Sequence, residues 1–523
     1  MQTWEPRRGR TLIWALVLAL GAGGVAAYAA YVRFGRDRGS PPPIVPQRAE
    51  ANISERVHVF CGACHAYPPA DTFPREHWRH EVERGYEFFS RAGKNLEAPP
   101  MDEVVEYYKE RAPEKLPPAK FENAKGPRPV EFQKIEVPAL EDKQPPAIAN
   151  VNLVHLFDER RLDVLACDMR RGQVLACQPY VEPPKWKLLA NVPNPCHTEV
   201  IDLDGDGIKD ILVANLGNFL PTDRLCGSVV WLRGNRDGTF TPYTLLENIG
   251  RVADVQAADF RGTGKLDLIV AAFGWNDTGE VYFLENHTTD WNHPNFKPRI
   301  VDKRHGAIHV PITDLNGDGK PDFVALFAQE HETVVAFIND GKGNFTAKEL
   351  YTGPHPAYGS SGIQLCDING DGKVDILYTN GDTLDIPYLL KYYHGIQWLE
   401  NKGDLKFEHH LITPMYGVHR AVAGDFTGTG RIDIMAVNFL PAEAFPMRAE
   451  QKLDSVIYLA QVAPGKFERH SMETITCNHT TCVAGDIYGR GQLDLVTGNF
   501  TTSTEKELGI TIWKNISGKP RPR

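Results

Sequence analysis

The feature that most constrains the fold of this chain is a nine-residue pattern of aspartate and glycine. Its fullest copy, 202–210, has aspartate at positions 1, 3, 5 and 9 and glycine at positions 4 and 6. Copies at 314–322 and 367–375 differ mainly in having asparagine at position 3, and weaker copies occur at 259–267, 425–433 and 486–494. The first residues of these six Asp loops are 57, 55, 53, 58 and 61 residues apart, which indicates a chain built from structural repeats.

Each repeat has the pattern of a four-stranded sheet. In the fullest copy, an apolar run follows Asp210, a second run covers 229–232, and an Asp-Gly turn at 237–238 leads into a last strand. Four strands per period are typical of a propeller blade. A degenerate copy, in which Asp158 lies 44 residues before Asp202, precedes the six. We therefore expect a mainly β fold with a seven-bladed β-propeller over residues 147–517.

The repeats resemble the FG-GAP or VCBS repeats of integrin-type propellers, as in Ala258-Asp259-Phe260 followed by Gly262, Gly264 and Asp267. Calcium prefers oxygen ligands such as these, and a helix-loop-helix site is excluded because position 12 is never Glu. The resemblance implies about three calcium ions. The implied ligands are Asp202, Asp204, Asp206, Asp210 and the Ile208 carbonyl; Asp314, Asn316, Asp318, Asp322 and the Lys320 carbonyl; and Asp367, Asn369, Asp371, Asp375 and the Lys373 carbonyl.

The other three Asp loops depart from this pattern at positions 3 and 5. The replacements are Arg261 and Thr263, Thr427 and Thr429, and Tyr488 and Arg490. We expect Arg261 and Arg490 to pair with the remaining aspartates and to take the place of the cation.

A second motif, Cys61-Gly-Ala-Cys64-His65, is typical of covalent attachment of one c-type haem, with His65 as the proximal iron ligand. Residues 57–116 resemble small α-helical c-type cytochrome domains that carry Tyr-Pro-Pro after the haem histidine, here 67–69. Met101, before a helical pattern, is the candidate sixth ligand, and His80 and His77 are the alternatives. Methionine ligation would raise the reduction potential relative to two histidines.

The N-terminus has the pattern of an export signal. Residues 11–32 are uncharged and mostly apolar, long enough to cross a bilayer, and they follow Arg7, Arg8 and Arg10. We interpret 1–38 as a transmembrane signal anchor, with cleavage near Ala27-Tyr28-Ala29 as the alternative. Residues 39–56 form a proline-rich spacer and 117–146 a linker. Because haem attachment occurs outside the cytoplasm, we expect a bacterial inner-membrane protein with its bulk in the periplasm.

Histidines recur near the start of the expected innermost strands. His197, Asp254, His309, His419 and His479 lie five to seven residues before the first residue of an Asp loop. In a propeller these positions face the channel mouth opposite the Asp loops, so the five residues are candidates for a metal or catalytic site. The alternative is an ordinary polar channel lining.

The charge and the cysteine content of the chain narrow the range of functions that the sequence predicts. The formal net charge of −10 gives no basic footprint for nucleic acid. Cys167 with Cys177, and Cys196 with Cys226, are candidate disulfides.

We expect an electron-transfer protein whose propeller docks a redox protein partner. The alternatives are an oxidoreductase with its active site on the histidine-bearing face and the haem as electron outlet, and an adhesion or binding propeller.

Overall fold

A computed structural model describes residues 52–141, 144–384, 388–502 and 508–518 of the chain. The predicted anchor at 1–38 lies outside these ranges. Within them, no helix combines the length and the apolar character needed to cross a membrane.

The first described segment is helical. It contains α2 (Ile53–Cys61), the short turns η1 (Ala70–Thr72) and η2 (Arg75–His77), α3 (Trp78–Ala92) and α4 (Met101–Arg111). Trp78 stacks on Tyr108 with ring centroids 3.7 Å apart, and its indole N–H donates to the Ala70 carbonyl at 2.9 Å. Val57, Val104 and Val105 are buried in the same core, so the segment has an apolar centre of its own.

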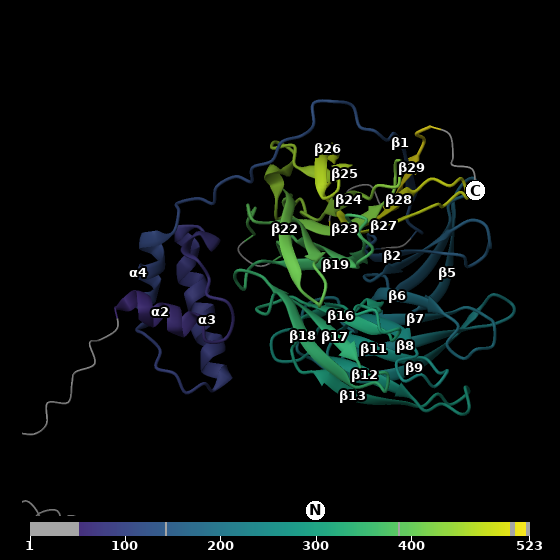
Figure 1. Cartoon of the computed structure of the whole chain (residues 1–523), viewed down its shortest axis with the longest axis horizontal. Helices are drawn as coiled ribbons and strands as arrows, with labels where there is room; N and C mark the ends of the chain where they lie inside the picture. The colour runs from purple at the N-terminus through teal and green to yellow at the C-terminus, as the bar shows by residue number, and fades with distance from the viewer. Residues whose placement is uncertain (1–51, 142–143, 385–387, 503–507, 519–523) are drawn as a thin grey trace, which may run out of the picture. The chain divides into compact units, whose positions relative to one another are not determined.

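The remaining described chain forms seven antiparallel sheets, one per predicted blade. In Figure 1 their colours change from blue through green to yellow in the order of the sequence. Blade one is β2 (Ile148–Val154), β3 (Asp163–Asp168), β4 (Gln173–Gln178) and β5 (Lys185–Asn191); blade two is β6 (Pro195–Ile201), β7 (Asp210–Asn215), β8 (Gly227–Gly234) and β9 (Phe240–Ile249); blade three is β10 (Val252–Ala258), β11 (Asp267–Ala272), β12 (Glu280–Asn286) and β13 (Phe296–Asp302). Blade four is β14 (Ala307–His309) with β15 (Ile312–Thr313), β16 (Asp322–Phe327), β17 (Thr333–Asn339) and β18 (Phe345–Thr352); blade five is β19 (Ser360–Cys366), β20 (Asp375–Asn380), β21 (Gly395–Asn401) and β22 (Phe407–Pro414). Blade six is β23 (Val418–Gly424), β24 (Asp433–Asn438), β25 (Asp454–Ala463) and β26 (Lys466–Thr474); blade seven contains β27 (His479–Gly485), β28 (Asp494–Asn499) and β29 (Leu508–Asn515). The predicted seven-bladed propeller is confirmed.

Apolar contacts between neighbouring blades form most of the core. All six residues of β7 are buried, as are those of β11 and β16, because each second strand lies between two sheets. Trp231 in β8 is completely buried and packs in one cluster with Leu212 of its own blade and Leu284 of blade three. Strands buried on both faces lose the two-residue alternation, which is why these runs are apolar throughout.

The last aspartate of each repeat, the closing Asp, joins its blade together. Asp210 accepts the Leu203 amide at 3.0 Å and the Gly234 amide, at the end of the third strand, at 2.7 Å. The same bond to the end of the third strand is made by Asp267, Asp322, Asp375, Asp433 and Asp494, at 2.8 to 3.0 Å. Each closing Asp thus connects the first two strands of its blade to the end of the third strand, which lies at the same end of the sheet.

Side chains at the end of the third strand also connect one blade to the next. Asn339 donates to the Phe260 carbonyl at 2.9 Å, Gln461 to the Ile368 carbonyl at 2.8 Å, and Asn515 to the Phe426 carbonyl at 2.9 Å. Each acceptor is the second residue of the Asp loop in the preceding blade. The Asp loops therefore take part in the contacts between neighbouring blades at these three junctions.

The ring is closed by β1 (Phe132–Pro138), which pairs with β29 and becomes the outermost strand of blade seven. This strand lies inside residues 117–146, the segment interpreted above as a linker. Only Val137 in β1 is buried, because an outer edge strand contacts its sheet along one edge. A solvent-facing edge strand has no apolar alternation, so its sequence looks like a linker.

The two candidate disulfides are wrong, because all nine cysteines are free thiols. Cys177 in β4 lies opposite Val164, and Cys167 lies opposite Val174. The Cys196 thiol instead contacts the Val252 carbonyl at 3.1 Å, while the Cys226 thiol contacts the Leu216 carbonyl at 3.6 Å. Strand register, which sequence spacing does not reveal, keeps each pair apart.

Ring closure can be tested with Val137→Asp. An unpaired carboxylate at this buried position is expected to cost about 3 kcal/mol of stability, because burying a charge without a partner is unfavourable. The melting temperature of the full chain should fall, while Gln133→Asp, at an exposed position of the same strand, should leave it unchanged. Equal melting temperatures for the two variants would contradict a closing role for β1.

Candidate functional site

The three complete Asp loops share one backbone shape, which hydrogen bonds to their first aspartate hold in place. The carboxylate of Asp202 accepts the amides of Gly205 at 2.9 Å and Gly207 at 3.0 Å, and Asp314 and Asp367 accept the equivalent amides. Gly205 and Gly207 have φ angles of 72° and 83°, a region that favours glycine, so the repeated glycines are needed for this turn.

The first loop brings the predicted ligands together. Oxygen atoms of Asp202, Asp204 and Asp210 all lie within 4.8 Å of one another. A cationic side chain already contacts a carboxylate in each complete loop: Arg233 lies 2.6 Å from Asp204, Lys320 3.0 Å from Asp318, and Lys373 2.8 Å from Asp371. These cations reduce the repulsion among the carboxylates and would have to adjust when calcium binds. The calcium ligands remain a prediction.

Two incomplete loops contain the expected substitute for the ion. Arg261 forms a two-point contact with Asp267, with Nη2–Oδ1 at 2.8 Å and Nε–Oδ2 at 2.9 Å. Arg490 lies 2.7 Å from Asp494 and donates to the Asn515 carbonyl at 3.0 Å. The predicted pairing of both arginines with their aspartates is confirmed, and it supplies a built-in cation at these two loops.

On the histidine-bearing side, three predicted candidates lie next to one another. Nδ1 of His197 is 2.8 Å from Oδ1 of Asp254, and Nδ1 of His309 is 3.9 Å from Oδ2 of Asp254. The amide of Val310 also donates to Asp254 at 2.9 Å. The carboxylate is nearly inaccessible, with 3% of its side chain exposed, and it lies between imidazoles of two neighbouring blades.

Arg420 completes this group, called here the axis cluster: His197, Asp254, His309 and Arg420. Its Nη1 atom lies 3.0 Å from Nε2 of His309, although the two residues belong to blades six and four. The intervening blade five has Gly362, where an added Cβ would lie 3.2 Å from Arg420. The missing side chain leaves room for the arginine to reach across the axis.

The other two candidates are placed differently. His479 is 1% exposed and lies between Asn499 at 2.7 Å and Glu473 at 2.7 Å, so both ring nitrogens have partners inside blades six and seven. His419 packs near the Phe439 ring. The members of the axis cluster all lie five residues before the first residue of their Asp loop, whereas His419 and His479 lie six and seven before it.

Burial and charge give the axis cluster distinct protonation states. Burial opposes ionisation of Asp254, but His197 and His309 outweigh it and hold the pKa of Asp254 well below its ordinary value. Burial likewise opposes charging of His197, yet Asp254 raises the pKa of His197. Burial, followed by the Arg420 charge, lowers the pKa of His309 to about 4. His309 is therefore neutral at pH 7 and accepts from Arg420.

Glu199, which the sequence patterns did not single out, extends this group along β6. Burial raises the pKa of Glu199 to about 7, while the charge of His197 acts in the opposite direction. A carboxyl that titrates near neutral pH beside a charged imidazole can exchange protons with it. The arrangement can therefore support acid–base chemistry or serve as a buried ion network that joins blades.

The haem motif lies at the end of α2. Cys61 is the last residue of that helix and Cys64 is exposed. Nδ1 of His65 lies 2.9 Å from the Ala66 carbonyl. Because a carbonyl can only accept, Nδ1 carries the proton and Nε2 keeps a free lone pair. Cys61 and Met101, the first residue of α4, both pack against the helical core.

The alternative sixth ligands differ in their surroundings. His80 lies 3.2 Å from Glu81 with about half of its side chain exposed, and His77 lies 3.7 Å from Glu76. Both therefore have an acidic neighbour, whereas Met101 contacts the apolar core.

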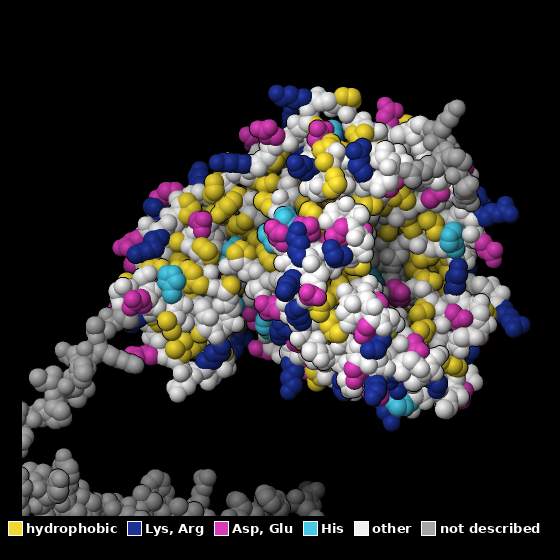
Figure 2. Space-filling model, in the orientation of Figure 1, with side chains coloured by type: hydrophobic (Ala, Val, Ile, Leu, Met, Phe, Trp, Pro, Cys, Tyr) yellow, Lys and Arg dark blue, Asp and Glu magenta, His cyan; other side chains and the backbone are white. Residues whose placement is uncertain are grey.

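Lys and Arg side chains are mixed with Asp and Glu over the face drawn in Figure 2. A nucleic-acid-binding surface would instead gather basic side chains into a patch or stripe. On the face shown, the two signs of charge are interspersed instead.

Comparison with known proteins agrees with the propeller. A family model described as FG-GAP-like repeat matches residues 202–270 and 314–378. Cartilage acidic protein 1 of Homo sapiens is 22% identical over 365 residues, which cover 66% of this chain and 52% of that protein. The Mus musculus protein of the same name is 23% identical over 313 residues, covering 56% and 47%. This chain thus contains FG-GAP-like repeats and spans about half the length of these curated relatives.

Among solved structures, the crystal structure of BBS1N in complex with ARL6DN, soaked with lead, aligns with a TM-score of 0.43 and 9% identity. The alignment covers 74% of this chain and 99% of that chain.

Calcium binding can be tested by metal analysis of the purified chain. We expect about three calcium ions per chain and a lower melting temperature after chelation. Asp204→Ala removes one ligand from the fullest loop and should leave about two ions. Asp237→Ala removes an exposed carboxylate of the β8–β9 turn, outside the Asp loops, and should retain about three. Loss of an ion in both variants, or in neither, would contradict this assignment.

The axis cluster predicts acid sensitivity. The pKa of an unfolded histidine is near 6.5, so a pKa of about 4 for His309 means that the unfolded chain binds more protons between these values. The contribution to stability is complete above pH ~6.5 and is lost as the pH falls toward 4, by about 3 kcal/mol. His309→Gln should reduce the fall in melting temperature between pH 7 and pH 5. His293→Gln, at an exposed histidine, should not.

Proposed function

We propose that this chain is an exported, membrane-anchored c-type cytochrome whose calcium-stabilised propeller docks a redox protein partner. The observation that carries the proposal is the Cys61–His65 motif at the end of a helix with an aromatic core. The apolar run at 11–32 supports the anchor, and the FG-GAP-like repeats support a binding-type propeller.

The local geometry suits covalent haem attachment. Both thiols of the motif are free, and Cys64 is exposed. The Ala66 carbonyl orients the His65 ring and leaves Nε2 available as an axial ligand. When bound, the haem would supply one-electron transfer. The chain's own contribution would be to attach the haem through two thiols and to offer His65 and, in our proposal, Met101 as iron ligands.

Aromatic packing explains how a short segment can hold such a group. The His58 ring stacks on Tyr67 with centroids 4.0 Å apart, and the Tyr67 hydroxyl lies 3.1 Å from that of Tyr107. The Tyr86 hydroxyl donates to the Pro99 carbonyl at 2.5 Å, which fixes the chain just before Met101. These contacts orient the segments on both sides of the proposed haem site and exclude water from the core between them.

The axis cluster favours a second candidate, an oxidoreductase with its active site on the histidine-bearing face and the haem as electron outlet. His197, Asp254 and Glu199 combine charge, burial and a carboxyl pKa of about 7. Against this, Asp254 accepts hydrogen bonds from the Val310 amide and the Gln256 side chain, and His309 contacts Arg420, which suits a structural network. If the His197→Ala variant no longer catalysed reduction of the haem while its haem content stayed the same, the enzyme would be favoured.

The haem can be tested by expressing the full chain with the haem maturation machinery of an exporting host. We expect a c-type optical spectrum with one haem per chain that remains attached after denaturation. Cys64→Ala should weaken this attachment, and Cys226→Ala, at a half-buried thiol outside the motif, should not affect it. A denatured protein without attached haem would overturn the proposal. If Met101 is the sixth ligand, Met101→Ala should lower the reduction potential or open the site, whereas His80→Ala and His77→Ala should not.

A further inference from the structure

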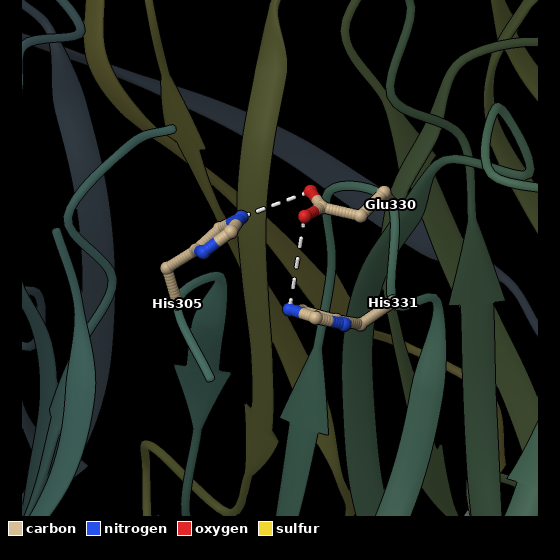
Figure 3. A group of neighbouring side chains, drawn as sticks. All are labelled: His305, Glu330 and His331. Atoms are coloured by element: carbon tan, nitrogen blue, oxygen red, sulfur yellow. Dashed lines mark hydrogen bonds and ion pairs between the residues drawn. The ribbon is translucent and has the colours of Figure 1, made fainter. Parts of the chain in front are cut away.

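A cluster on blade four, separate from the axis cluster and from the Asp loops, has the composition of a metal site. His305 lies between β13 and β14, while Glu330 and His331 lie between β16 and β17. Figure 3 shows the two imidazole rings and the carboxylate directed toward one another. We call His305, Glu330 and His331 the blade-four triad.

The ligand atoms are close to metal-binding distances. Nε2 of His305 is 2.9 Å from Oε2 of Glu330, and Nε2 of His331 is 3.9 Å from Oε1 of the same carboxylate. All three residues offer an atom within 4.8 Å of the other two. Ligand atoms about 2.1 Å from a tetrahedral ion are about 3.4 Å apart, so the observed spacings lie on both sides of the required value.

One of these atoms has an unmet bonding requirement. Nε2 of His331 is buried and has no hydrogen-bond partner in the described structure. A buried polar nitrogen without a partner is unfavourable, and each such case needs an explanation. Its direction toward Glu330 and the nearby His305 is explained if an ion lies between the three side chains.

The backbone holds the two loops together. The amide of Ala328 donates to the Gly306 carbonyl at 2.8 Å, next to His305. Gly306 has φ of 82°, and a Cβ there would lie 2.7 Å from the Ala328 carbonyl oxygen, so only glycine allows this approach. On the other side, the Glu332 carboxylate accepts the Gly359 amide at 3.0 Å and the Ser360 amide at 2.7 Å. The triad is thus supported from blade four and blade five.

Nearby positive charge is partly balanced at this position, because Arg304 repels a cation at His331 whereas Glu330 and Asp302 attract it. Arg304 is the closest basic neighbour in sequence, but it pairs with Asp302 at 2.7 Å and lies over the Phe327 ring at 4.3 Å. The comparable group Glu400, Glu408 and His410 is less suitable, because Lys402 lies 2.6 Å from Glu400 and 3.2 Å from Glu408. A lysine ammonium already occupies the cation position there.

We propose that the blade-four triad binds a divalent first-row transition ion, of which zinc is the representative, through Nε2 of His305, Nε2 of His331 and a carboxylate oxygen of Glu330. Imidazole nitrogen suits zinc, iron, copper and nickel better than it suits calcium, so this site differs in chemistry from the Asp loops. Two histidines and one carboxylate leave at least one coordination position open, as in exchangeable rather than purely structural zinc sites. The site would therefore accept a water molecule or a small anionic ligand.

The proposal can be tested by titrating the full purified chain with zinc and following the binding by calorimetry. Excess calcium is present to fill the Asp loops. We expect one tight zinc equivalent. His331→Gln and His305→Gln should each weaken zinc binding at least about tenfold. His287→Gln is the matched control, because His287 pairs with Glu285 at 3.2 Å in blade three without a third ligand.

Cobalt(II) provides a second readout that does not depend on affinity alone. Cobalt bound at the triad should give visible absorption bands of low coordination number, and these bands should be lost in His331→Gln but retained in His287→Gln. Melting temperatures without added metal should stay within a few degrees of the parent chain, which separates loss of the site from loss of the fold. Equal zinc affinity in the parent, both triad variants and the control would overturn the proposal, as would loss of binding in the control alone.

Discussion

The propeller depends on one repeated interaction, the buried closing Asp that receives backbone amides from its Asp loop and from the end of the third strand, which lie at the same end of the sheet. Burial raises the pKa of Asp210, Asp322 and Asp375, and it raises the pKa of Asp494 to about 6, so each carboxylate is held at an energetic cost. The bonds to the Asp loop and to the end of the third strand offset that cost. Carboxamide side chains at the same strand ends then join neighbouring blades. Aspartate therefore determines the shape of the loop and the blade, while asparagine and glutamine make the contacts between blades.

This arrangement separates the two sides of the propeller. The Asp loops gather oxygen ligands and cations on one side, and the residues that differ from blade to blade lie at the opposite ends of the same strands. In two incomplete loops an arginine performs the cation's part, which explains how a blade can keep its shape without a bound ion. On the other side, the axis cluster depends on Gly362. Because this residue has no side chain, Arg420 has room to reach His309. The stabilising Asp loops and the candidate chemical site thus lie at opposite ends of the same strands.

Three kinds of ligand occur in this chain, and each suits a different metal. Two thiols and an imidazole at 61–65 suit haem, carboxylates and carbonyls in the Asp loops suit calcium, and the imidazoles with one carboxylate on blade four suit a transition ion. The first two are patterns of adjacent residues. The third is assembled from positions 25 residues apart in sequence, on loops that glycine brings close together. Donor chemistry therefore distinguishes the three proposed metal sites.

The sequence by itself determined the features that depend on residues close together in the chain. The spacing of Asp and Gly predicted seven blades, and the pairing of Arg261 with Asp267 and of Arg490 with Asp494 followed from positions within one turn. Tertiary structure alone decided the contacts between distant strands. It placed β1 at the edge of blade seven, enclosed His479 between Asn499 and Glu473, kept Cys167 and Cys177 out of register, and brought His305 to Glu330. The physical reason is that local turns depend on backbone geometry over a few residues, whereas register, ring closure and side-chain convergence depend on how separate sheets pack.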